Sequence, residues 1–504
     1  MHITSSSISD WPALAWVAVV NTSGQLRLWH GPDVEVHEDW FGEIAWDGNF
    51  DSADFDTAEH VVGSGGRCRD GNWTFVSASS TLDRLNHTIA DADLVVSNSL
   101  HALAANLGWE PIVQKPDYAA DFQSICRGFK DYQDRIEMDG GPIHVTYHDN
   151  LHWSDGKRQL RPKPLRSRTL DDFDDYHQAM LDVLRRLSDN WTDPARRIVW
   201  KPIASVSTGY DSPTVCALAK SAVGLQESLT ITKGRSGDSD DGSGIAKAMG
   251  LVCHTFRRDQ WMQHPGCEVP FIAADGKGED VYFAPAENLL RRRVVMTGYG
   301  GTRVWGLSPK TNDELQRGDQ SGLSHAEARL HLGYLHLPVP FLVARQPAEL
   351  RKISRDPSMD SWHVPGDYNC PIARRIVEQQ SVPREAFGMT KKAASILFFD
   401  LDSFLSPESR RAFDAWYQET YSWPFRFTQS IKRTLTRVFR RTIGLGQLTC
   451  RLLSNLIPLR VLTKIGTSSR LREYVAYEPR FQFLFAWACQ ETIRQYREGA
   501  SEHF

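Results

Sequence analysis

The residues best suited to chemistry in this sequence form a hexapeptide, Ser207-Thr208-Gly209-Tyr210-Asp211-Ser212. Gly209 permits an unusual backbone angle and a close approach by a ligand. The N–H groups of such a turn, together with the Ser and Thr hydroxyls, can cradle an anion at the start of a helix. Asp211 would repel a bare phosphate, but it suits Mg²⁺ that bridges phosphate oxygens. An ordinary strand–turn–helix with a Ser or Asp cap gives the same pattern, so both interpretations stay open.

The elements around the hexapeptide alternate between strand-like and helix-like patterns. Apolar runs predict strands, and amphipathic runs between them predict short helices. This alternation predicts a parallel sheet with right-handed crossovers, and such sheets bind ligands at the carboxyl ends of their strands. The glycine turns 207–212 and 297–301 both fall at such ends; after about residue 310 we expect mostly helix. The expected strands are 197–207, 227–234, 251–256 and 294–301, and the expected helices are 213–224, 242–250 and 286–293.

The first 165 residues have a different pattern. Short alternating apolar runs separated by Gly, Asp and Asn predict a β-rich N-terminal domain. One helix is expected at 97–108, where Gly108 suits the C-cap. The Pro- and Arg-rich stretch 154–167 indicates a linker, and 169–187 has the spacing of an amphipathic helix with aspartates near its start.

Composition excludes several classes of protein. The chain has 504 residues, 41% of them hydrophobic, and a formal net charge of −4, which is ordinary for a globular protein and unlike a disordered, collagen-like or polytopic membrane protein. The near-neutral charge argues against a specific nucleic-acid binder. The eight cysteines contain no CxxC pair, which indicates reduced thiols, and no signal peptide or membrane span is expected. We therefore expect a cytoplasmic protein.

One segment departs from this balance. Residues 426–472 hold 11 Lys or Arg and no Asp or Glu. An amphipathic helical hairpin with solvated basic faces explains the pattern. Contact with an acidic membrane surface, or with a polyanionic substrate, explains it as well.

The hexapeptide resembles a variant of the SGGxDS pyrophosphate loop of N-type ATP pyrophosphatases. The order of the following segments is similar to the synthetase domain of asparagine synthetases and β-lactam synthetases: a strand with an acidic loop in 229–256, then Thr297-Gly298-Tyr299-Gly300-Gly301-Thr302 where the family has SGEGxDE or TGYGxD. The resemblance covers about residues 195–395. It implies an α/β synthetase domain at 166–415 with a doubly wound parallel sheet of the adenine nucleotide α-hydrolase-like class. A degenerate Ntn-like α+β domain at 1–165 would precede it, and a helical extension at 416–504 would follow.

The resemblance also implies a reaction. A substrate carboxylate would attack the α-phosphorus of ATP, giving an acyl-adenylate and pyrophosphate, and an amine would then displace AMP to form an amide. The cofactors would be ATP and Mg²⁺, with Asp211 as the metal ligand. The residues that the resemblance assigns to nucleotide binding are Ser207, Thr208, Gly209, Tyr210, Asp211, Ser212, Thr232 and Gly298.

Four residues are carried over as catalytic candidates. Tyr299 falls where β-lactam synthetases have the tyrosine of a Tyr–Glu pair that deprotonates the amine, and Glu327 is the candidate partner. A phenol can act this way only beside an oriented partner. Lys391 and Lys392 resemble the family's late catalytic lysine, and the register between them is open. A packed turn aromatic, an exposed helix residue and a solvated helix start are the alternative roles for Tyr299, Glu327 and the lysines.

Three positions differ from the family pattern. Met1 is followed by His2 and the nearest cysteine is Cys68, so the N-terminal cysteine that releases ammonia from glutamine is missing. Thr302 aligns with the usual metal-binding aspartate, and a hydroxyl is a poorer Mg²⁺ ligand than a carboxylate. Thr208 replaces a glycine of the loop.

These observations favour an ATP-dependent, AMP-forming ligase that makes an amide or lactam-type bond without glutamine. Its substrates would be a small-molecule, peptide or glycan carboxylate and an amine, and a homodimer stays open. One alternative is a catalytically degenerate synthetase fold that binds nucleotide or serves as a scaffold, which Thr208 and Thr302 favour. Another is an adenylating transferase that delivers sulfur or an amine to a nucleotide or glycan.

Overall fold

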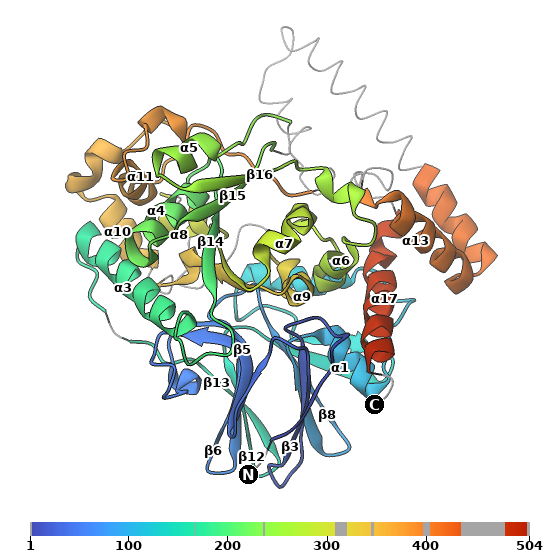
Figure 1. The fold of residues 1–504 in the computed structure, drawn as a ribbon. Coiled ribbons are helices and arrows are strands. Elements are labelled where there is room, and N and C mark those ends of the chain that lie inside the picture. Colours follow the sequence, from blue (N-terminus) through green and yellow to red (C-terminus); the bar gives the residue numbers. More distant parts are fainter. Residues whose placement is uncertain are drawn as a thin grey trace.

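The computed structural model describes residues 3–166, 168–234, 237–307, 320–343, 347–396, 404–434 and 479–500 (Figure 1). Of the basic segment predicted at 426–472, residues 435–472 lie outside the described residues. Among the helices that are described, none is both long and apolar enough to cross a membrane.

The N-terminal region contains two β-sheets. In spatial order, the first sheet consists of β1 (Ile3–Ser7), β3 (Leu26–His30), β2 (Trp16–Val20), β9 (Asp93–Ser97), β8 (Leu85–Ala90), β11 (Gly141–Thr146) and β10 (Arg135–Met138). The second consists of β13 (Lys157–Arg161), β12 (Asn150–Ser154), β7 (Asn72–Val76), β6 (Val61–Arg69), β5 (Trp40–Trp46) and β4 (Glu35–Val36).

The two sheets pack face to face, and one helix covers the outer face of the first sheet (Figure 1). Strand β2 shows why, since all five of its residues are buried. Alternate side chains of a strand point to opposite faces. Trp16, Ala18 and Val20 therefore enter the core between the sheets, whereas Val17 and Val19 pack toward α1 (Leu100–Leu107). On the second sheet, the outward-facing Trp40, Ile44 and Trp46 pack with Phe50, Ala53 and Phe55 of the loop after β5, while α3 (Phe173–Trp191) also packs against β5.

Local signals set the ends of two of these helices, and the second lies four residues further along the chain than the predicted 169–187. Ser99 caps α1, because its side chain accepts a hydrogen bond from the Ala102 N–H, and Gly108 ends the helix with φ +71°. Helix α3 begins after Asp172, whose side chain accepts from the Asp175 N–H. Both arrangements follow the ordinary preferences of helix ends.

The predicted linker 154–167 is wrong for its first half. Strand β13 pairs antiparallel with β12 from Asn150↔Arg161 to Ser154↔Lys157. Asp155 and Gly156 form the turn with φ +50° and +70°, which is the backbone that an Asp-Gly hairpin turn prefers. Arg158 and Arg161 thus lie on an edge strand, where charged side chains are common.

A third sheet lies in the middle of the chain and is entirely parallel. Its spatial order is β16 (Val252–Phe256), β15 (Glu227–Ile231), β14 (Lys201–Ser205), β17 (Arg293–Thr297) and β18 (Leu335–Pro338). The first four strands lie within the ranges expected from the sequence, or one residue outside them. Strand β18 was not expected, because the sequence after residue 310 was predicted as mostly helical.

Helices cover both faces of the parallel sheet. Ala204, Val294 and Met296 pack with α4 (Asp211–Val223) and α5 (Ser243–Ala248) in one core cluster. Ile203 and Val295 belong to a second cluster with α6 (Val269–Asp275), η4 (Val281–Ala286) and α7 (Glu287–Leu290). The strands are apolar on both faces because neither face meets water.

The remaining described helices pack around these sheets. They are α2 (Tyr118–Gln123), α8 (Gly301–Trp305), α9 (His325–Leu332), α10 (Pro347–Ser354), α11 (Pro371–Glu378), α13 (Pro407–Thr420) and α17 (Leu484–Gly499), with 3₁₀ turns η1 (Phe55–Thr57), η2 (Ser124–Arg127), η3 (Gln260–Gln263), η5 (Val339–Phe341), η6 (Pro357–Trp362), η7 (Arg384–Ala386) and η8 (Pro479–Phe483). Helix α17 returns to the N-terminal region and packs against α1 and α6 (Figure 1).

A buried ion cluster joins the N-terminal sheets to α9. Arg329 donates to both oxygens of Glu43 at 2.8 and 3.0 Å and to Asp83 at 2.7 Å, and all three side chains are buried. Burial alone would lower the pKa of Arg329, but the two carboxylates outweigh it and raise the pKa. The guanidinium therefore stays charged and neutralises both acids at this junction.

We predict that Arg329→Met lowers the free energy of unfolding by about 3–5 kcal/mol, because it leaves two buried carboxylates without a counter-charge. Arg494→Met is the matched control: its ion pair with Glu491 is exposed, so the loss should stay below about 1 kcal/mol. Denaturant unfolding of both variants checks this. Equal effects would show that the buried cluster contributes no more than a surface ion pair.

Candidate functional site

A cavity opens where the order of the parallel sheet reverses. The chain runs from β14 to β15 and β16 on one side and then crosses to β17 on the other, so the carboxyl ends of β14 and β17 lie side by side. Ligand sites of parallel sheets form at such points. The cavity encloses about 790 Å³, including solvent at its mouth. Its lining residues include Ser207, Gly209, Tyr210, Asp211, Ser212, Asp240, Tyr282, Phe283, Gly298, Tyr299, Thr302, Tyr368, Lys391 and Lys392.

Close packing holds the two glycine turns together. A Cβ on Gly298 would lie 2.7 Å from the Asp211 carbonyl carbon, and one on Gly301 would lie 2.6 Å from the Asp211 carboxyl group. Any larger residue at these positions would displace α4 or the turn. The Thr302 hydroxyl then donates to Asp211 Oδ2 at 2.9 Å. The loop after β17 thereby fixes the position of the Asp211 carboxylate at the start of α4.

The hexapeptide turn is itself hydrogen bonded. The N–H and hydroxyl of Thr208 both donate to Asp240 Oδ1, at 3.0 and 2.7 Å. The Gly209 N–H donates to Ser207 Oγ at 3.3 Å, and the Tyr210 N–H donates to Tyr368 Oη at 3.2 Å. Three of the N–H groups expected to form an anion cradle thus have protein acceptors. An anion would have to replace these acceptors to bind there.

Asp240 is a site residue that the sequence prediction did not assign. It belongs to the acidic loop between β15 and α5, its side chain is buried, and its carboxylate bonds Thr208 at the cavity. The run of acidic residues at 238–241 was the available signal. Several acids in one loop look alike in sequence, so only the packed loop selects Asp240.

The two lysines have different contacts. Lys392 Nζ lies 3.3 Å from Thr208 Oγ1 and also donates to the Ser239 carbonyl at 2.5 Å, so it is tied to the turn and to the acidic loop. Lys391 lines the same cavity and is the more exposed of the two. The lining of the cavity therefore includes two lysines together with the carboxylates of Asp211 and Asp240.

Tyr299 lies at the inner end of a buried polar network. Its hydroxyl donates to Asp280 Oδ1 at 2.8 Å and lies 3.1 Å from Tyr282 Oη and 3.2 Å from His325 Nε2. Burial and the negative charge of Asp280 hold the pKa of Tyr299 well above its usual value. The phenol is therefore protonated at neutral pH, and its proton points to a carboxylate.

Asp280 is held in turn by other donors. Its Oδ2 accepts from the Gly322 N–H at 2.8 Å and the Ser324 hydroxyl at 2.6 Å. His325 Nδ1 bonds the hydroxyl of Tyr334, and burial lowers the pKa of His325. A neutral His325 that accepts at Nδ1 can donate from Nε2 to Tyr299, which leaves the Tyr299 proton for Asp280.

The predicted pairing of Tyr299 with Glu327 is wrong. Glu327 accepts hydrogen bonds from Ser99 at 2.7 Å and Tyr496 at 2.8 Å, and it pairs with His101 at 3.0 Å. Burial alone would raise the pKa of Glu327, but His101 outweighs it and holds the pKa well below its usual value. Glu327 thus joins α9 to α1 and α17, because its place on α9 faces those helices. Asp280 is the carboxylate that contacts Tyr299.

Thr232, like Thr208, is a predicted residue that is absent from the cavity lining. Its N–H and hydroxyl both face the Phe256 carbonyl, at 3.0 and 3.4 Å, where they extend the pairing of β15 with β16. Tyr368, in contrast, lines the cavity although the sequence gave no indication of it. It comes from a segment far along the chain that carries no motif.

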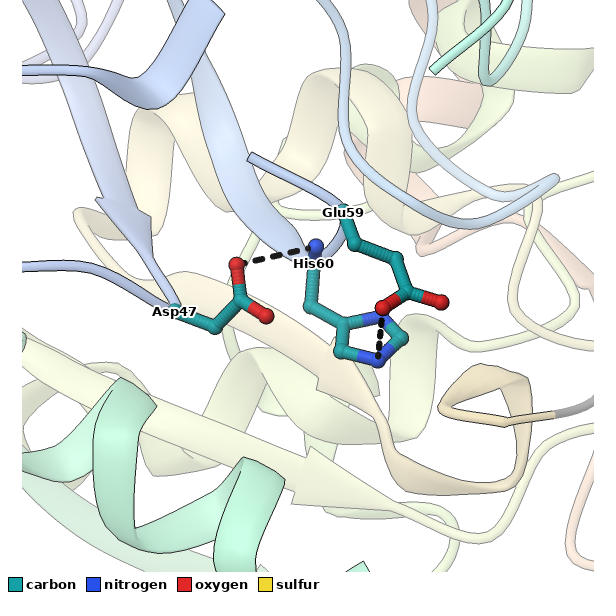
Figure 2. A group of neighbouring side chains, drawn as sticks. All are labelled: Asp47, Glu59 and His60. Atoms are coloured by element: carbon teal, nitrogen blue, oxygen red, sulfur yellow. Dashed lines mark hydrogen bonds and ion pairs between the residues drawn. The ribbon is translucent and has the colours of Figure 1, made fainter. Parts of the chain in front are cut away.

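A separate cluster has the composition of a metal site. Asp47, Glu59 and His60 place one ligand atom each within 4.8 Å of one another (Figure 2). Arg168, however, donates to Glu59 at 2.7 Å and lies 3.4 Å from His60 Nε2. Arg166 and Arg186 pair with Asp47 at 3.8 and 3.9 Å. Guanidinium groups thus occupy the positions of a cation, and the cluster is an ion-pair network.

No family model and no curated protein sequence matches this chain.

We predict that Gly298→Ala disturbs this site, because the added methyl group would overlap Asp211. Overpacking of this kind costs about 1–3 kcal/mol of folding free energy. Gly244→Ala is the matched control, since a Cβ there meets nothing within 4 Å and alanine favours helix α5. Thermal unfolding should show a lower midpoint for Gly298→Ala and an unchanged or higher one for Gly244→Ala. A Gly298→Ala variant as stable as the native chain would contradict the packing described for the two turns.

Proposed function

We propose that the chain is an ATP-dependent, AMP-forming ligase that adenylates a substrate carboxylate and forms an amide or lactam-type C–N bond without glutamine. The observation that carries the proposal is the convergence at one cavity of both glycine turns, the carboxylates of Asp211 and Asp240 and the cations of Lys391 and Lys392. These groups come from four separate segments.

The proposal includes the fold class. The parallel order β16-β15-β14-β17-β18, with helices on both faces, is the arrangement expected of a doubly wound, adenine nucleotide α-hydrolase-like synthetase domain. The two packed sheets of the N-terminal region, with α1 on the outer face of the first, support its assignment as a degenerate Ntn-like domain. Because the sequence has no cysteine before Cys68, the attacking amine would come from a substrate rather than from glutamine.

The donor set fits Mg·ATP. Asp211 and Asp240 offer the oxygen ligands that Mg²⁺ prefers, and the Thr302 hydroxyl lies beside Asp211. Lys391 and Lys392 would neutralise phosphate oxygens of the bound nucleotide. When bound, Mg²⁺ would supply charge neutralisation on the triphosphate. The residues of this chain orient the nucleotide and hold the carboxylate substrate near it.

Tyr299 and Asp280 are suited to accept a proton from the amine. The Tyr299 oxygen can accept a proton from the amine while the phenol proton passes to Asp280. The transfer therefore needs no free phenolate. Gly322 and Ser324 orient Asp280 for this transfer. His325 keeps the phenol oxygen in place from the other side.

A second candidate is a catalytically degenerate protein with the same fold. It is favoured because the N–H groups of Thr208, Gly209 and Tyr210 already donate hydrogen bonds to acceptors within the protein. A turn stabilised in this way needs no phosphate to complete its hydrogen bonding. Nucleotide binding without turnover, or no nucleotide binding, would follow.

For the ligase we propose a cytoplasmic location, since Cys216, Cys370 and Cys489 are buried free thiols. Its substrates would be a carboxylate and an amine. We propose no specific nucleic acid as a partner. A homodimer is compatible with the proposal.

The first test is binding of Mg·ATP and ATP–pyrophosphate exchange in the presence of cell extract as a source of substrate. Asp211→Asn should abolish exchange, because it removes a carboxylate from the cavity. Asp259→Asn, at an exposed aspartate that pairs with Arg257, should leave it unchanged. Native protein that binds Mg·ATP but shows no exchange would favour the degenerate candidate, and absence of Mg·ATP binding would overturn the ligase.

A second test separates the two half-reactions. Tyr299→Phe should slow amide formation by about 10²–10⁴-fold while exchange continues, because only the amine step needs the phenol as a proton acceptor. Tyr132→Phe removes a hydroxyl that bonds the Val145 carbonyl in the N-terminal region, so both steps should persist. Equal loss of exchange and amide formation in Tyr299→Phe would assign Tyr299 a structural role.

A further inference from the structure

Three large apolar side chains form an exposed stripe on the helical segment 423–434. Trp423 is 66% exposed, Phe427 53% and Ile431 46%, and residues four apart lie on one face of a helix. The rings of Trp423 and Phe427 stack with centroids 5.2 Å apart. Single exposed apolar residues are ordinary, but a contiguous row of this size marks an interaction surface.

The opposite face of the segment fixes it to the body of the protein. Phe425 packs against Tyr421 and Phe483, with ring centroids 4.8 and 5.7 Å apart, and Gln429 is buried. Because Phe425 and Gln429 on this inner face pack into the core beside α13 and η8, the stripe points away from that core.

Basic residues lie on both sides of the stripe. At 3.6 residues per turn, Arg426 and Arg433 fall on one side and Lys432 on the other. The segment has no acidic residue, and the sequence stays free of Asp and Glu through residue 472 although the whole chain has a net charge of −4. All charged side chains of the described segment 423–434 are therefore basic.

We propose that this stripe, Trp423, Phe427 and Ile431 with Arg426 and Lys432, docks on the surface of an anionic lipid bilayer. Aromatic and aliphatic side chains on one face of a helix bury into the headgroup–acyl boundary, while flanking cations pair with lipid phosphates. A nucleic acid would use the cations but leave the apolar row exposed. A second copy of the chain, docked about a two-fold axis, would bring like charges face to face.

This inference is independent of the ligase. The stripe lies on residues 423–431, and none of its residues lines the nucleotide cavity. Membrane docking would hold the cavity near a bilayer without any change in its chemistry. Failure of either proposal leaves the other standing.

Co-sedimentation of the full chain with vesicles tests it. The native chain should sediment with vesicles of phosphatidylglycerol and phosphatidylcholine, and much less with phosphatidylcholine alone. Trp423→Ser/Phe427→Ser/Ile431→Ser should weaken binding by at least tenfold, and Arg426→Gln/Lys432→Gln by about fivefold per charge. Raised salt should weaken binding of the native chain, because surface charges are screened.

A matched triple variant controls for lost surface hydrophobicity. Leu160→Ser/Leu165→Ser/Val252→Ser changes residues that are 47%, 59% and 61% exposed elsewhere on the protein, and it should bind like the native chain. Unfolding midpoints of all variants should match, since the replaced side chains are exposed. Native protein that ignores anionic vesicles, or a stripe variant that binds as tightly as the native chain, would overturn the proposal. A stripe variant that binds vesicles like the native chain but shows less self-association in sedimentation velocity would also overturn the proposal.

Discussion

The contact between Asp211 and the glycine turn after β17 is the constraint on which the site depends. Gly298 and Gly301 allow the two turns to approach within contact distance, and Thr302 completes the contact through its hydroxyl. Because β14 and β17 are neighbours in a parallel sheet, their carboxyl ends bring these turns together at one edge. Without that approach the cavity would lose one wall and Asp211 its fixed position.

Buried charge has a second structural role in this protein. Arg329 joins Glu43 and Asp83 across the junction with the N-terminal sheets, while Glu327, on the same helix, joins α1 and α17. Asp280 forms a third buried cluster beside Tyr299. In each case hydrogen-bond donors surround the carboxylate, which offsets the cost of taking a charge out of water. Helix α9 thus contacts the N-terminal sheets on one face and borders the candidate site on another.

Much of the parallel sheet could be predicted from the sequence, because buried strands are apolar runs and glycine turns mark their ends. The sequence of the edge strand β13 predicts a linker, because its lysine and arginines mask the Asp155-Gly156 hairpin signal. Strand β18 was missed because a single four-residue strand has no periodicity to distinguish it from a helix.

The sequence by itself determined the two glycine turns, the order of the elements around them and the residue types that meet at the cavity, because these are encoded within short stretches of chain. Only the tertiary structure decided which distant side chains join them. It placed Asp280 rather than Glu327 beside Tyr299, and it brought Tyr368 to the hexapeptide turn. The physical reason is that the direction of a helix face depends on what the whole helix packs against. The spacing of residues within a short stretch of sequence does not specify which distant elements a helix face packs against.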